Sequence, residues 1–366
     1  MKHFILLLIS LFLALPIFAS GDGNILPSEL GVVKSVKYTD SVNDVAQAEQ
    51  VVQVELISGE NKGEVVGINN MLSGNPYYDM NLKTGEKVII HVEDNGEGLE
   101  YSIEDIKRSD SLIWLSLLFC GLLLYVGKKK GLYSLISIGL TVVLICNGLA
   151  PMILIGINPV FAAIIICIIS TAITMYLVGG FNAKSTSATL GAILSLSFAA
   201  ILAFIVMETA HLTGFVGENS MFLYAAHPEL DFIGIAISAM ILATLGAVMD
   251  VAMSIASTIN EIHLTDKTKT VKELFVSGMN VGRDIIGTMA NTLILVYLGG
   301  SIPLLLLVSN IDLYKFINLN QVVTEIASAL IGSIAIVICV PFTALVASGL
   351  IYKYAKRAEY DNIKLN

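Results

Sequence analysis

Residues 232–259 read FIGIAISAMILATLGAVMDVAMSIASTI, an almost unbroken apolar run. About 20 such residues cross the hydrocarbon core of a bilayer, so this run is long enough to form a membrane-spanning helix. The whole chain of 366 residues has the same character, with 55% hydrophobic residues, 14% charged residues and a mean hydropathy of +0.79. These values lie far outside the range of water-soluble domains and predict an α-helical polytopic membrane protein.

About seven apolar spans make up the predicted membrane domain at residues 111–352, and residues 353–366 form a tail. The spans are 111–127, 131–155, 158–178, 186–211, 232–259, 284–308 and 321–352. Two of them contain helix-breaking residues: the sixth has Gly299-Gly300-Ser301-Ile302-Pro303, and the seventh has Pro341. Each interruption is consistent with a kink or with a discontinuous helix of the kind found in transporters.

Residues 1–21 combine a basic Lys2, a short apolar run and small residues at Ala19, Ser20 and Gly21. This pattern is typical of a signal peptide, but the cleavage site is imperfect, so an uncleaved N-terminal anchor is the alternative. Both interpretations predict that the segment that follows is exported.

Residues 25–108 change to short β-branched runs separated by turn signals such as SGENKG and DNGEG. The predicted strands are 31–38, 49–57, 63–69, 86–94 and 99–106, and five short strands favour a small all-β domain, an OB-like barrel. Residues 22–110 contain 17 Asp and Glu against 7 Lys and Arg, whereas residues 111–366 contain 13 of each class. The acidic domain lacks a stripe of basic and aromatic residues, so it is not expected to bind nucleic acid.

The basic residues of the predicted loops give the orientation of the membrane domain. If the loop at Lys128-Lys129-Lys130 is cytoplasmic, twelve basic residues lie on the cytoplasmic side and only Lys315 lies outside. This asymmetry predicts a multi-pass protein of the cell (inner, cytoplasmic) membrane with an extracytoplasmic β domain and a cytoplasmic C-terminus.

All four cysteines, Cys120, Cys146, Cys167 and Cys339, lie within the predicted spans. The exported domain therefore has no disulfide framework, and the thiols are interpreted as small apolar packing residues. The sequence contains no HExxH or GxSxG signature, and its five histidines are scattered. We therefore expect neither an enzyme activity nor a cofactor.

Two predicted spans carry the same polar pattern. DVAMSIAST (250–258) and DIIGTMANT (284–292) each place an aspartate, a hydroxyl residue four positions on, and Ser or Asn three positions further. This spacing puts Asp250, Ser254 and Ser257 on one helix face, and Asp284, Thr288 and Asn291 on another. Small residues at 239, 243 and 246 extend the first face.

We predict that these faces oppose each other on antiparallel helices, with Asp250 near Asn291 and Asp284 near Ser257. The alternative is interhelical packing by polar side chains, with Arg283 as the charge partner of Asp284. An unpaired carboxylate at this depth costs at least about 2.5–3.5 kcal/mol, which favours a hydrated or cation-occupied cavity around Asp250. The predicted cation, proton or solute site therefore comprises Asp250, Ser254, Ser257, Asp284, Thr288 and Asn291; no metal is specified.

Three segments resemble the signature segments of the YibE/F-like membrane proteins: GGFNAKSTSA (179–188), GAVMDVAMSIAST (246–258) and GRDIIGTMANTLILVYLGG (282–300). The similarity extends over nearly all of residues 30–352. It implies an extracytoplasmic β domain followed by a multi-spanning helical domain, and it supplies no activity or binding residues.

The residues themselves therefore indicate two alternative functions. The first is a transporter or channel for a small cation or solute, with the polar site between the fifth and sixth spans. The second is a scaffold or accessory subunit without transport activity, whose β domain docks an envelope protein. The partners expected are the lipid bilayer, a small cation or solute, and either a second copy of the chain or an envelope protein.

Overall fold

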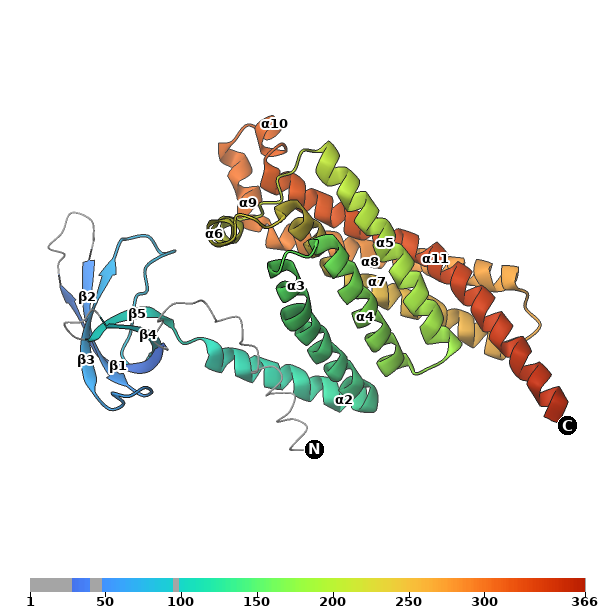
Figure 1. Ribbon diagram of the computed structural model, residues 1–366, viewed down its shortest axis with the longest axis horizontal. Coiled ribbons are helices and arrows are strands. Elements are labelled where there is room, and N and C mark those ends of the chain that lie inside the picture. Colours follow the sequence, from blue (N-terminus) through green and yellow to red (C-terminus); the bar gives the residue numbers. More distant parts are fainter. Residues whose placement is uncertain (1–27, 40–47, 95–98, 366) are drawn as a thin grey trace. The chain divides into compact units, whose positions relative to one another are not determined.

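A computed structural model describes residues 28–39, 48–94 and 99–365 (Figure 1). The predicted signal peptide or anchor at residues 1–21 lies outside these ranges. The described residues form two compact units, residues 28–125 and 126–365. The first unit contains the β domain together with the first part of a long helix, and the second contains the remaining helices.

Five antiparallel strands form the β domain, as the sequence predicts. They are β1 (Glu29–Thr39), β2 (Ala48–Leu56), β3 (Val65–Leu72), β4 (Lys87–Asp94) and β5 (Leu99–Ile106). The sheet order is β3-β2-β1-β4-β5, and β5 lies close to β3, so the sheet curls into a near-closed barrel. This strand order confirms the predicted OB-like class.

The barrel core follows from the two-residue period of the strands. Along β2, Val52, Val54 and Leu56 are buried, while the residues between them face outward. They pack with buried residues of the other strands, such as Val33 and Ile90. Because alternate side chains point to opposite faces of a sheet, this register gives the small domain one continuous apolar interior.

A fully buried polar residue, Gln50, fastens the loop between β3 and β4 onto the barrel. Its amide nitrogen donates to Asn81 Oδ1 (3.0 Å) and to the Leu82 carbonyl (3.3 Å). Its amide oxygen accepts from Asn70 Nδ2 (2.9 Å) and from the Leu82 backbone N–H (3.2 Å). Leu82 itself is buried in the barrel core, so these bonds hold an apolar side chain in place.

Gln50→Leu is expected to destabilise the β domain by about 1–3 kcal/mol, because the buried Leu82 N–H and the Asn70 amide lose their acceptor. Pulse proteolysis of the solubilised protein in increasing urea measures this effect. Gln53→Leu, on the opposite face of the same strand, is the control and should change the urea midpoint little. Equal midpoints for both variants would contradict the role assigned to Gln50.

The helical part of the chain begins at Ser109, directly after the barrel. The helices are α2 (Ser109–Leu144), a π-helical turn (Ile145–Leu149), α3 (Ala150–Leu154), α4 (Pro159–Gly179), α5 (Ala183–Thr209), α6 (Glu218–Ala226), α7 (Phe232–Thr265), α8 (Val271–Gly300), α9 (Ile302–Leu306), a 3-10 turn (Leu307–Asn310), α10 (Leu313–Phe316) and α11 (Asn320–Leu365). Among the described residues, six helices are long and apolar enough to cross a membrane.

The first of these six, Ser109–Leu154, covers the first two predicted spans. Its backbone leaves the helical conformation at Lys128, which has φ 48° and ψ −126°. A positive φ is uncommon for a residue with a side chain, so the helix is broken there. The break falls where the sequence separates two spans, at the LysLysLys segment.

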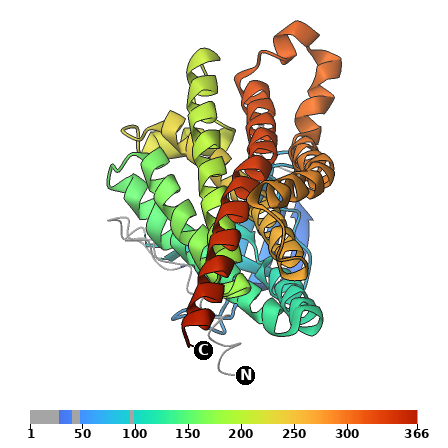
Figure 2. The same cartoon turned by 90° about the vertical axis from the view of Figure 1, so that its right-hand side faces the viewer.

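Small residues set the core of the helical unit, in which α5, α7 and α11 lie side by side (Figures 1 and 2). At Gly191 of α5, a Cβ atom would lie 2.8 Å from the Cα atom of Thr343 in α11. The Ser195 hydroxyl, one turn further along α5, donates to the Ala335 carbonyl of α11. In a membrane, such close packing and interhelical hydrogen bonds hold helices together where the hydrophobic effect does not.

Helix α8 packs against α7 and α11 through two more glycines. A Cβ atom at Gly278 would lie 2.6 Å from Ile259 Cδ1 of α7, and one at Gly282 would clash with Val340 Cγ1 of α11. By contrast, no atom of the described structure that could obstruct a Cβ lies within 4 Å of the Cβ position at Gly287, which is on the exposed side of α8.

Gly282→Leu is therefore expected to lower the stability of the protein in detergent by about 1–3 kcal/mol through overpacking. Gly287→Leu, one and a half turns along the same helix, should change stability by no more than about 0.5 kcal/mol. Thermal unfolding of the two purified variants provides the comparison. Similar losses for both would show that α8 is not packed as described.

The two predicted interruptions have different outcomes. The sixth predicted span, 284–308, does not coincide with one helix: α8 runs from Val271 to Gly300, and Pro303 belongs to the separate short α9. Thr270 starts α8 early, because it forms a capping box with Glu273. Pro341 lies inside α11, which continues through it as one helix.

Candidate functional site

The predicted polar stripe of α7 lies on the exposed face of this helix. Ala239, Ala243, Gly246, Asp250 and Ser254 are all exposed, and Ser257 is half-buried. Most of the remaining faces of α7 are buried, because the helix packs against α4, α5, α8 and α11. The stripe is thus the one broad face of α7 that these helices leave uncovered.

The predicted polar residues of α8 are also exposed. Asp284, Thr288 and Asn291 lie away from the buried residues of this helix, which are Leu274, Gly278, Gly282 and Leu293. Helix α8 is the least buried of the six candidate spans.

The packing of α7 against α8 determines which residues of the two helices lie at the same height along the helix axes. Gly278 lies opposite Ile259, Gly282 lies near Ile255, and Leu293 and Thr244 both lie against Gly332 of α11. In this antiparallel register Asp250 is level with Gly287, and Asp284 and Asn291 lie within about one turn on either side. The predicted overlap in depth of the two polar segments is therefore present.

On both helices the polar residues point away from the side that packs on the rest of the helical unit. On α8, Gly282 faces Val340 of α11. Asp284 follows Gly282 by two residues, or about 200° around the helix, and so points away from α11. Five exposed residues define what we call the α7–α8 polar face: Asp250, Ser254, Asp284, Thr288 and Asn291.

Within the described residues, no hydrogen bond or ion pair links the side chains of this face to one another. The Thr288 hydroxyl donates instead to the Ile285 carbonyl of its own helix (3.0 Å). The predicted contacts of Asp250 with Asn291 and of Asp284 with Ser257 are therefore not hydrogen bonds in this chain. The reason is that both faces point outward and not toward each other.

Arg283 also differs from the prediction. Its guanidinium donates to Asn280 Oδ1 (3.0 Å) and forms no ion pair with the neighbouring Asp284 in the described structure. Adjacent residues on a helix point about 100° apart, which separates these two side chains. The face thus keeps its two carboxylates without a basic partner from the described part of the same chain.

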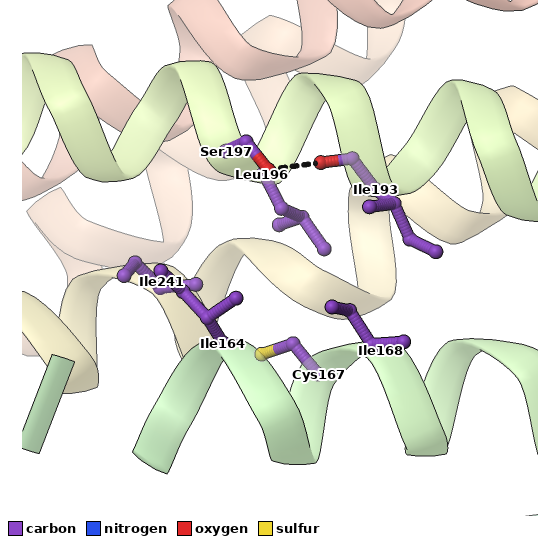
Figure 3. A pocket seen from close by; sticks show the side chains of 7 residues that line it. All are labelled: Ile164, Cys167, Ile168, Ile193, Leu196, Ser197 and Ile241. Atoms are coloured by element: carbon purple, nitrogen blue, oxygen red, sulfur yellow. Dashed lines mark hydrogen bonds between the residues drawn. The ribbon is translucent and has the colours of Figure 1, made fainter. Parts of the chain in front are cut away.

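A small pocket lies elsewhere, among α4, α5 and α7 (Figure 3). It is lined by Ile164, Cys167, Ile168, Ile193, Leu196, Ser197 and Ile241. The one hydroxyl in it, that of Ser197, donates to the Ile193 carbonyl of its own helix. This apolar pocket contains none of the predicted site residues, so it is not the polar cavity expected between the fifth and sixth spans.

Sequence reasoning missed one feature of this region. It did not single out Gly287, which leaves the surface of α8 without a side chain at the level of Asp250. Residue spacing alone could not reveal this, because it depends on which face of α8 meets α7 and α11.

The α7–α8 polar face offers carboxylate, hydroxyl and amide oxygens, the ligands that hard cations and protonated solutes prefer. No group of three or more His, Cys, Asp or Glu side chains in the described chain has the arrangement of a metal site. An exposed carboxylate in a hydrocarbon layer costs about 2.5–3.5 kcal/mol or more. Where this face lies within the hydrocarbon layer, water, a bound cation or another protein surface must therefore cover it.

Two protein-family models match the chain. The model described as YibE/F-like protein matches residues 115–353, and the model described as YibE/F family N-terminal domain matches residues 28–106. No curated protein and no solved structure matches it. The first model alone covers more than half of the chain, and its range contains the α7–α8 polar face and all or most of each apolar helix. The chain is therefore an integral membrane protein that belongs to the YibE/F-like family.

Proposed function

We propose that this protein conducts a small cation or solute across the membrane, along a route that includes the α7–α8 polar face. The observation that carries the proposal is the pair of carboxylates, Asp250 and Asp284, at nearly the same level in two apolar helices. Ionisable side chains inside membrane spans most often mark ion or substrate pathways, because removing them from water without such a role is unfavourable.

In this proposal Asp250 is the cation- or proton-binding group. Ser254 and Thr288 supply hydroxyl oxygens and Asn291 an amide oxygen, and Asp284 adds negative charge within about one turn of Asp250. The acidic β domain also favours a positively charged substrate, since its excess of Asp and Glu raises the local concentration of cations and repels anions.

The second candidate function is a scaffold or accessory subunit without transport activity. One observation favours it: the polar face is open at the side of the helical unit, and the pocket among α4, α5 and α7 is apolar. A face of this kind also fits a docking site for another membrane helix. Flux measurements separate the two functions.

Purified protein in liposomes should carry at least one member of a panel of protons and mono- and divalent cations. Asp250→Asn should reduce that flux by at least about tenfold, the effect of losing roughly 1.4 kcal/mol of cation stabilisation, while expression and thermal stability stay unchanged. Glu208→Gln, an exposed carboxylate at the end of α5, is the matched control and should retain flux. No flux of any tested species would favour the scaffold function.

We further propose that the protein lies in the cell (inner) membrane with its β domain extracytoplasmic and its C-terminus cytoplasmic, because basic residues are so unevenly distributed among the loops. Reporter fusions after Lys130, within 262–275 and after Tyr354 should report cytoplasmic locations. Fusions after Gly98 and within 214–230 should report export. A cytoplasmic signal from the β domain would reverse the orientation.

A further inference from the structure

The length of α4 indicates where the hydrocarbon layer lies along the helical unit. Helix α4 is the shortest of the six apolar helices in the described chain, and it contains no Asp, Glu, Lys, Arg or His. Its 21 residues rise about 31 Å, which matches the roughly 30 Å of a bilayer core. The two ends of α4 therefore mark the two surfaces of the layer.

Contacts at both ends of α4 relate these two levels to α7. At the start of α4, a Cβ atom at Gly234 of α7 would lie 3.2 Å from Pro159 Cδ. At its end, a Cβ atom at Gly179 would lie 2.9 Å from Met253 Cε of α7. The rise from Gly234 to Met253 is about 28 Å, close to the length of α4. Met253 therefore marks the level at which α7 leaves the hydrocarbon layer.

Both α7 and α8 continue beyond this level. Helix α7 ends at Thr265, about 18 Å past Met253. On α8, Gly282 lies near Ile255 of α7. In the antiparallel register Asp284 is therefore level with Met253, and the preceding residues of α8 lie beyond it. In Figure 1 the connection between α7 and α8 reaches beyond the connection between α4 and α5.

The Asp, Glu, Lys, Arg and His residues of the two helices change in frequency at the same level. Before Met253, α7 contains one of them, Asp250, and after it come Glu261 and His263. Residues 285–300 of α8 contain none. Residues 271–284 contain four: Lys272, Glu273, Arg283 and Asp284. Because such side chains are unfavourable in lipid, the composition supports independently the boundary that the α4 contacts give.

We infer that the α7–α8 hairpin beyond Met253 and Asp284 projects from the membrane into water, on the side proposed to be cytoplasmic, and that a hydrated cation reaches Asp250 from this side. Asp250 lies at the base of the projection, about one turn inside the layer. At this depth a cation can bind the carboxylate and keep part of its water shell. Asp284, at the membrane surface, attracts cations to the entrance.

The role of the cation rests on the proposed function, whereas the position of the boundary does not. Exposure to water can be measured without any flux. A protein that transports nothing but shows the expected exposure would contradict only the proposed function. A protein that transports a cation but lacks this exposure would contradict only the present inference.

The first experiment measures the reaction of single cysteines with a charged maleimide. The full-length protein, with its four native cysteines replaced by alanine, is placed in lipid nanodiscs. Ser254→Cys should react within about tenfold of Glu261→Cys, because both thiols reach water and can ionise. Ala243→Cys is exposed on the same face of α7 but about 15 Å inside the layer, so it should react at least about a hundredfold more slowly.

A second pair on α8 repeats the comparison. Asn280→Cys should react rapidly and Leu295→Cys slowly, although both sites are exposed in the chain. Thermal unfolding shows that each variant folds, and either pair alone tests the boundary. Slow reaction of Ser254→Cys or of Asn280→Cys, equal to that of its partner within the layer, would overturn the inference.

The second experiment identifies the side of access. The rings of Tyr352 and His263 lie 6.2 Å apart, so a C-terminal tag on α11 is on the same side as the α7–α8 hairpin. Sealed liposomes with one protein each are captured by this tag, and a cationic methanethiosulfonate is added outside. It should modify Asp250→Cys and Glu261→Cys but not Glu229→Cys, which lies in the loop before α7. Asp250→Cys that does not react from this side would overturn the inference.

Discussion

The absence of hydrogen-bonding partners in the hydrocarbon core is the constraint on which the helical part of this protein depends. Each backbone amide must be satisfied within its own segment, so six long helices form and the exposed side chains are mostly apolar. The same constraint makes every exception informative. Hydroxyls within the helices mostly donate to carbonyls of their own helix, as Thr288 and Ser197 do, and so remain satisfied without a partner.

The carboxylates of the α7–α8 polar face cannot be satisfied in that way. Asp250 and Asp284 are exposed, lie level with each other, and have no hydrogen bond or ion pair among the described residues. A single chain therefore leaves this face incomplete. Transport and the docking of another membrane protein both answer the same physical need, which is to surround charged oxygens with water, cations or a complementary protein surface.

Glycine has two different roles in the same helix pair. Gly278 and Gly282 let α8 approach α7 and α11, and substitutions there act through folding. Gly246 and Gly287 face open space, so substitutions there leave the packing of one chain intact and act on whatever approaches from outside. Substitutions at the two open glycines can therefore test the function of this surface without unfolding the chain.

The sequence by itself determined the class of this protein, the five strands of its barrel and the existence of two matching polar segments, because hydropathy and residue period are local properties. It also indicated that Asp250 and Asn291 overlap in depth, since helix rise is constant. It did not determine the end of α8 at Gly300 or the direction in which the polar faces point. Those features depend on which faces the neighbouring helices cover. Only the tertiary structure decided that Asp250 and Asp284 point outward, because α7 packs its large apolar residues such as Ile255 and Ile259 inward, and α8 packs Gly278 and Gly282 inward.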